Sequence, residues 1–176
     1  MDLSIKSQTF QLIYDYALFR LHVSAVKESR LKAFPLPNPC LLSKKMRYLG
    51  LKFSNEITEW VQFNQKDISV SDYENWRTMV HAGFNECENI SPRLVFAYFE
   101  FVSVCGVFAV STPVNGPNVK DICDYATEYL CNSNRFMQFL FKQNGWQGFI
   151  HTEYMKHRAP QEQVFKQWLQ MFSTQE

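Results

Sequence analysis

The sequence lacks the features that disulfide scaffolds, metal sites and most catalytic centres need. Its five cysteines are an odd number and none forms a Cys-x-x-Cys pair, which argues against a disulfide framework or a zinc site. The four histidines are scattered, without a carboxylate at metal-ligand spacing, and there is no glycine-rich phosphate loop. These absences predict a protein that is not an enzyme and that uses no catalytic residue, metal or cofactor.

The chain also lacks an excess of either charge. Its net charge is +1, and its one local basic cluster, Lys44, Lys45 and Arg47, is explained by a solvated helix face. A nucleic-acid partner would require a basic face or stripe, so none is expected. Residues 1–11 are polar and contain no apolar signal-peptide core. Together with the unpaired cysteines, this favours a reducing, cytoplasmic location.

Large apolar side chains are abundant. Of the 176 residues, 46% are hydrophobic and 16% are aromatic, enough for one domain over residues 1–176 with one sizeable core. The run over about residues 93–110 holds a single charge, Glu100, between its ends, and apolar residues cover every side of the helix it would form. The run is short for a membrane span of about 20 residues, and a central charge there costs about 2.5–3.5 kcal/mol. We therefore expect this helix at the centre of a soluble bundle.

The rest of the chain has helical rather than strand periodicity. Patterns over residues 10–26, 40–63, 119–130 and 136–143 predict helices, as does the stretch that follows residue 72. Two short closing helices are expected over residues 146–154 and 163–172. Gly50 allows a break in the second helix, and three alternating prolines make residues 34–39 an extended linker between the first and second helices. The expected fold is all-α, with seven or eight helices around the central hydrophobic one.

Glu100 is the residue that most invites an active-site interpretation. A general acid or base would need a second titratable group in the same pocket, and the sequence names none. We interpret Glu100 as a carboxyl at the edge of the buried helix that reaches solvent or a partner.

Four segments carry related patterns in a fixed order: LIYDYALFRL (12–21), MRYLGLKF (46–53), SPRLVFAYFEF (91–101) and QNGWQGFI (143–150). They resemble, in turn, the BH4, BH3, BH1 and BH2 motifs of the Bcl-2 family of apoptosis regulators. The closing QEQVFKQWLQ (161–170) is similar to the family's helix before the membrane anchor. Each motif alone is weak, but four in order within an all-helical chain of matching length are fairly specific. The resemblance implies a Bcl-2-like bundle.

The resemblance also implies a surface groove that binds an amphipathic BH3 helix from a pro-apoptotic partner of the Bim, Bak or Bax kind. The apolar helix is expected to floor this groove and the two helices before it to wall it. The expected lining residues are Phe53, Ile57 and Val61 on the first wall, Met79, Val80 and Phe84 on the second, and Leu94, Ala97, Tyr98 and Phe101 on the floor. Arg93 is expected to pair with the ligand's aspartate.

The chain departs from the family pattern at several positions. Leu51 stands where the BH3 motif has aspartate, so this segment is a poor ligand and belongs to the fold. Pro92 replaces the glycine of BH1, where its ring hinders the close approach of a ligand. A single Gly145 replaces the usual BH2 pair. Aligning Arg93 with the family arginine leaves one extra residue before the Ala-Tyr-Phe-Glu-Phe block, whereas aligning that block puts Leu94 at the arginine position.

These features predict an anti-apoptotic, Bcl-2-like protein that is cytoplasmic or associated with the mitochondrial outer membrane. The missing BH3 aspartate argues against a killer, which must expose a working BH3 helix. The divergence would suit a viral inhibitor of host cell death or an invertebrate homologue. Two alternatives stay open: an adaptor that keeps the fold without the groove and binds through another surface or as a homodimer, and a pro-apoptotic Bak- or Bax-like member.

Overall fold

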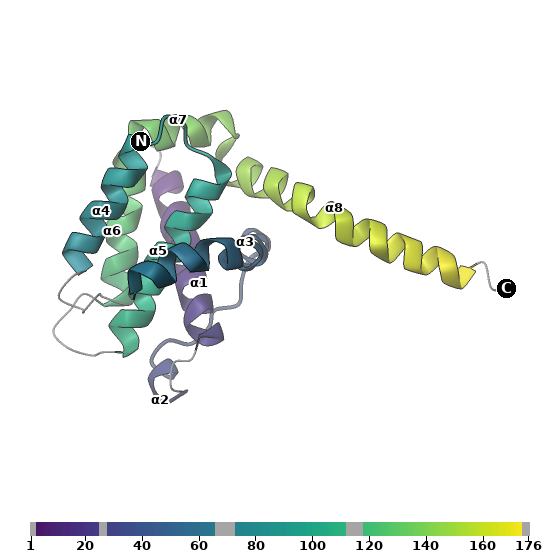
Figure 1. The fold of residues 1–176 in the computed structure, drawn as a ribbon, viewed down its shortest axis with the longest axis horizontal. Helices are drawn as coiled ribbons and strands as arrows, with labels where there is room; N and C mark the ends of the chain where they lie inside the picture. Colours follow the sequence, from purple (N-terminus) through teal and green to yellow (C-terminus); the bar gives the residue numbers. More distant parts are fainter. Residues whose placement is uncertain (1–2, 25–27, 66–72, 112–117, 174–176) are drawn as a thin grey trace.

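A computed structural model of the chain describes residues 3–24, 28–65, 73–111 and 118–173, and these residues form an all-helical fold without strands. The expected all-α fold is confirmed. The described helices are α1 (Leu3–Val23), α2 (Glu28–Leu31), α3 (Leu41–Gln65), α4 (Tyr73–Glu86), α5 (Pro92–Ser111), α6 (Val119–Asn132), α7 (Asn134–Lys142) and α8 (Gly145–Ser173) (Figure 1). Residues 35–40, which include the predicted linker's prolines, have no regular secondary structure and connect α2 to α3.

Helix α5 lies inside the bundle, where α1, α3 and α6 pack against it. Over Pro92–Val110 it is long and apolar enough to cross a membrane, but 67% of that stretch is buried inside the bundle. This degree of burial is expected of a core helix, because an apolar helix without a wet face must be enclosed. Pro92 occupies the first turn of α5, where its missing N–H has no partner to lose, and the Ser91 hydroxyl accepts from the Leu94 N–H at 3.2 Å.

Helix α3 runs without a break through Gly50, so the break that this glycine allowed does not occur. The Tyr16 ring of α1 lies directly over Gly50: a Cβ added there would be 2.1 Å from the Tyr16 Cε2 atom. The glycine is thus needed for the close approach of α1 and α3 rather than for a turn.

The corner between α7 and α8 depends on two residues in the left-handed region, Asn144 with φ 62° and Gly145 with φ 76°. Asn144 is therefore a non-glycine residue in this region, directly before Gly145. Immediately after the corner, the buried Trp146 donates from Nε1 to the Thr9 hydroxyl of α1 at 2.7 Å. A Cβ added to Gly148 would be 2.1 Å from the Gln143 carbonyl oxygen. The tryptophan and glycines of the QNGWQGFI segment therefore fix how α8 leaves α7.

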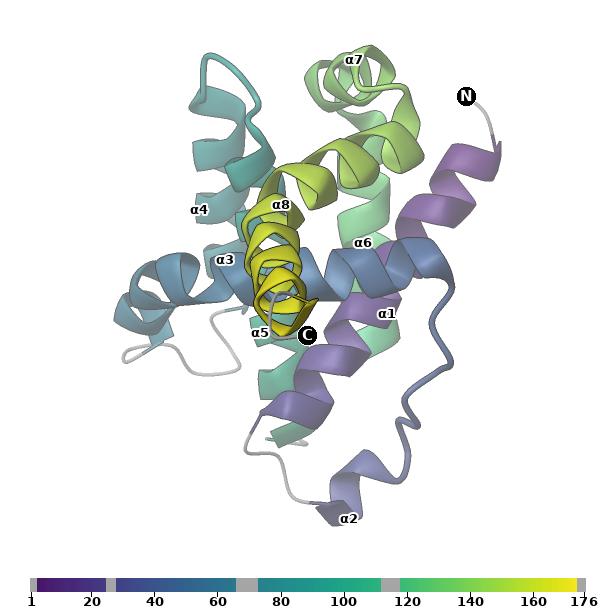
Figure 2. The ribbon, with the colours of Figure 1, turned by 90° about the vertical axis from the view of Figure 1, so that its right-hand side faces the viewer.

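The two closing helices expected over residues 146–154 and 163–172 are instead one helix, α8, so that prediction is wrong. The helix continues through Pro160. An interior proline removes one backbone hydrogen bond and can bend a helix without ending it. The first half of α8 packs against α3 and α7. Its second half extends away from the bundle, as Figures 1 and 2 show, and Leu169 and Met171 are exposed there.

Candidate functional site

Glu100 lies at the centre of a buried polar network between α1 and α5. Its carboxylate accepts from the Tyr16 hydroxyl at 2.5 Å and from the Arg20 Nε at 2.9 Å, and it is only 2% exposed. The expectation that Glu100 has a partner is correct, whereas the alternative of contact with solvent is wrong. Burial and the adjacent carboxylate raise the pKa of Tyr16 well above its ordinary value, so this hydroxyl stays protonated and donates. The network joins α1 to α5 and occupies both carboxylate oxygens.

A second buried ion pair joins α1 to α3. The Arg47 guanidinium donates to both Asp15 carboxylate oxygens, at 2.9 and 2.6 Å, and also to the Pro37 carbonyl oxygen at 3.1 Å. The Arg47 side chain is 12% exposed, so the interpretation of residues 44–47 as a fully solvated basic cluster is wrong for this member. Bidentate pairing of arginine with a carboxylate fixes direction as well as distance. This contact holds the segment that resembles BH3 in one orientation.

The BH3-like segment faces into the bundle. Met46, Leu49 and Gly50 are buried, and Phe53 stacks on the Phe96 ring of α5 with 5.0 Å between centroids. Leu51, at the position of the family's aspartate, is 40% exposed. The apolar face that a free BH3 helix would present to a partner is therefore used within this protein.

One strip of α5 remains partly open. Leu94, Ala97, Val104 and Phe108 are half-buried and lie at helical spacing on one side of the helix, where Phe101, between Ala97 and Val104, is covered. The other two expected floor residues, Tyr98 and Phe101, are each 3% exposed. The structure thus divides the expected floor into a half-open part, which includes Leu94 and Ala97, and a covered part.

The expected wall residues are in different situations. Phe53 is half-buried and its ring also meets the edge of the His157 ring of α8, with 4.8 Å between centroids. Val80 is half-buried against the core and Phe84 is 3% exposed. The side chains of Ile57 and Val61 on α3 and of Met79 on α4 lie outside the described residues.

Arg93 is in the first turn of α5 and is exposed. One turn separates it from Ala97 on the half-open strip, because residues four apart are neighbours on a helix surface.

Helix α4 is attached to α5 and α6 by a group of rings that sequence reasoning missed. We call His81, Phe84, Tyr98, Tyr125 and Tyr129 the aromatic cluster. The His81 ring lies nearly parallel to the Tyr129 ring, with 3.6 Å between centroids and 4° between planes. Its Nε2 atom is 3.0 Å from the Tyr98 hydroxyl. The spacing of Tyr125 and Tyr129 is the available sequence signal, since it places both rings on one side of α6.

Tyr98 and Phe101 form the deep part of the expected floor, where the aromatic cluster packs. Phe84 of α4 contacts the Tyr98 ring at 5.6 Å between centroids, and Tyr98 in turn contacts Phe101 at 6.2 Å. The next residue of α4, Asn85, accepts from the Tyr129 hydroxyl at 2.8 Å. A ligand would therefore meet Tyr98 only after α4 has moved.

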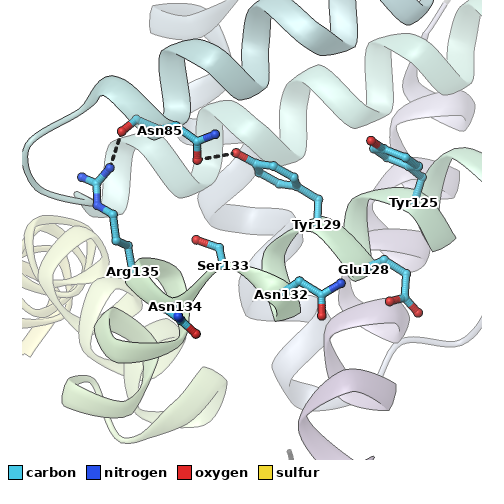
Figure 3. Close-up of a pocket in the computed structure, with 8 residues that line it drawn as sticks. All are labelled: Asn85, Tyr125, Glu128, Tyr129, Asn132, Ser133, Asn134 and Arg135. Atoms are coloured by element: carbon cyan, nitrogen blue, oxygen red, sulfur yellow. Dashed lines mark hydrogen bonds between the residues drawn. The ribbon is translucent and has the colours of Figure 1, made fainter.

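Two surface cavities lie away from the half-open strip. The first, of about 490 Å³, is at the corner between α6 and α7. Asn85 of α4 also lines it and is hydrogen-bonded to Tyr129 and Arg135, as Figure 3 shows. The second, of about 470 Å³, lies between α1 and residues 33–43. None of the eight expected groove residues whose side chains the structure describes lines either cavity.

Comparisons of the chain with known protein families, with curated proteins and with solved structures find no match.

Proposed function

We propose that this chain is a Bcl-2-like regulator of cell death that binds the BH3 helix of a pro-apoptotic partner along α5, between α3 and α4. The observation that carries the proposal is the half-open strip of Leu94, Ala97, Val104 and Phe108 on an apolar helix that is 67% buried. Such a strip matches the spacing of apolar anchors on an amphipathic helix. Arg93, next to this strip, would pair with the ligand's aspartate.

The orientation of the BH3-like segment supports an anti-apoptotic role. A killer of this family would have to release that segment as a ligand. Here the release would break the Asp15–Arg47 pair and expose Met46 and Leu49, which are 1% and 0% exposed. Breaking a buried ion pair alone costs about 3–5 kcal/mol. We therefore prefer sequestration of BH3 ligands to the Bak- or Bax-like alternative, and we place the protein in the cytoplasm or at the mitochondrial outer membrane.

A second candidate is the adaptor that keeps the bundle without using a groove. The aromatic cluster favours this candidate, because it includes Tyr98 and contacts Phe101, and each of these two expected floor residues is only 3% exposed. Phe53, on the first wall, is likewise engaged with Phe96 and His157. An adaptor would bind through another surface or as a homodimer.

Titration of the purified protein with BH3 peptides of the Bim, Bak and Bax types separates the two candidates. The groove proposal expects saturable binding of at least one peptide by calorimetry. Ala97→Arg, which places a long charged side chain on the strip, should abolish that binding while the melting temperature changes little. Lys142→Ala, an exposed charge change on α7, is the control and should bind normally. Absence of binding across the panel by the folded protein would reject the groove and favour the adaptor.

Arg93→Ala tests the assigned ion pair. If the pair with the ligand's aspartate is desolvated, its loss should weaken binding by at least about 2 kcal/mol, or about 30-fold in Kd. The same peptides and the same Lys142→Ala control apply. An unchanged Kd would remove Arg93 from the site without rejecting the groove.

A further inference from the structure

His81 occupies an unusual position for an ionisable side chain. It is 9% exposed and lies among tyrosine rings of two other helices: Tyr98 of α5, and Tyr125 and Tyr129 of α6. Its contact with Tyr129 is a near-parallel stack, and its Nε2 atom is hydrogen-bonded to the Tyr98 hydroxyl. The ring is thus a contact that α4 makes with both α5 and α6.

The charges around His81 are unfavourable to a second proton. Arg77, one turn earlier on α4, holds its guanidinium carbon 3.9 Å from the Tyr125 ring centroid, beside the imidazole. At the other end of the cluster, Arg135 donates to the Asn85 carbonyl oxygen. The groups that face His81 from α5 and α6 are the neutral tyrosines. Among the described residues, the charged group that shifts the His81 pKa is Arg77, and it acts in the same direction as burial.

We propose that protonation of His81 detaches α4 from α5 and α6, so that mild acid uncovers the deep part of α5. A protonated imidazole has two N–H donors and a full positive charge. At this site the charge would be buried near the positive Arg77, and both conditions disfavour the protonated form. Because Phe84 and Tyr98 contact each other and are each 3% exposed in the docked arrangement, detachment would bring two large rings into contact with solvent. The inference concerns α4 alone and holds whether or not a BH3 ligand binds.

The direction of the pH dependence follows from the two pKa values. Burial and then Arg77 lower the pKa of docked His81 from 6.5 to about 4. A lowered pKa means that the docked state binds fewer protons, so docking is at full strength above pH 6.5 and weakens as the pH falls toward 4. Between pH 7 and pH 5, these two pKa values correspond to an about 20-fold loss in the docking equilibrium.

Hydrogen exchange of the whole chain, followed by mass spectrometry and corrected for intrinsic exchange rates, tests the proposal. We expect protection of residues 73–86 to fall about 20-fold from pH 7 to pH 5, while the buried part of α6 keeps its protection. His81→Phe keeps a flat ring in the stack but cannot be protonated, so its α4 protection should not depend on pH. His151→Gln, at an exposed histidine of α8, is the matched control and should behave as the wild type does.

Two results would overturn the proposal. One is a His81→Phe variant that loses α4 protection on acidification as the wild type does, because the pH dependence would then come from another group. The other result is measured on the wild-type protein by nuclear magnetic resonance, so it does not depend on whether a variant folds. A His81 ring that titrates near 6.5 while α4 stays protected would show that protonation does not detach the helix.

Discussion

The packing of α1 against α3 can be tested by adding a single methyl group at Gly50. An alanine Cβ at this position would lie 2.1, 2.4 and 2.5 Å from Cε2, Cζ and the hydroxyl oxygen of Tyr16. All three distances are far below van der Waals contact. Tyr16 is 1% exposed, and its hydroxyl is held at 2.5 Å from Glu100, so the ring cannot move aside without loss elsewhere.

The expected cost of Gly50→Ala combines three effects. Overpacking of a dense core costs about 1–3 kcal/mol. If the ring shifts, the hydrogen bond from Tyr16 to the Glu100 carboxylate is weakened, and bonds to charged groups contribute about 1.5–3 kcal/mol. The opposing effect is helix propensity, because alanine is better than glycine in a helix interior by about 0.8–1 kcal/mol. We expect a net destabilisation of about 2–4 kcal/mol.

Urea denaturation followed by circular dichroism measures this change, and Gly83→Ala is the matched control. Gly83 is also inside a helix, but nothing lies within 4 Å of its added Cβ. That substitution should stabilise the protein by about 0.5–1 kcal/mol. The opposite signs of the two glycine-to-alanine changes are the critical result. A Gly50→Ala protein as stable as the wild type would show that Tyr16 does not pack over this glycine.

Two further substitutions test the contacts of α5 and α8. Glu100→Gln removes the charge that Arg20 pairs with at 2.6 Å, and it should cost about 3 kcal/mol in the same denaturation experiment. Glu128→Gln is its control, because the Glu128 side chain is 51% exposed and its pair with Lys6 should be worth less than about 1 kcal/mol. Equal effects of the two would contradict the buried network. Gly148→Ala places a Cβ 2.1 Å from the Gln143 carbonyl oxygen, so it should open the α7–α8 corner, lower the melting temperature and weaken the near-ultraviolet dichroism of Trp146; an unchanged spectrum would refute this.

Most of the helices could be predicted because the sequence signals that mark a helix come from residues close together in the chain. The start of α5 at Pro92 and the continuous apolar run after it need only neighbouring residues to be recognised. Helix α8 was harder to predict, since a proline inside a pattern can end a helix or only bend it.

The partners of the buried charges could not be predicted. Arg20 and Glu100 are 80 residues apart, and Asp15 and Arg47 are 32 apart. Asp15 and Arg20 are charged residues within an amphipathic helical pattern, and such a pattern alone predicts that they face solvent. Whether another helix covers that face is decided by the tertiary fold.

The candidate groove shows the same division between local and tertiary information. Spacing placed Leu94, Ala97 and Phe101 on one side of α5, and that much depends only on helix geometry. How far α4 stands from that side depends on the size of the rings between them. His81 and Phe84 fill that space against Tyr98, which is 3% exposed, while Leu94 and Ala97 stay half-open. A helical ligand therefore has two available geometries: it lies along the half-open strip with α4 in place, or it replaces α4 on the aromatic cluster. In the second geometry the ligand reburies the same rings that the departure of α4 exposes. The net binding free energy then depends on how weakly α4 is held against α5 and α6. His81 is the residue of the contact between α4 and these helices whose charge varies with pH.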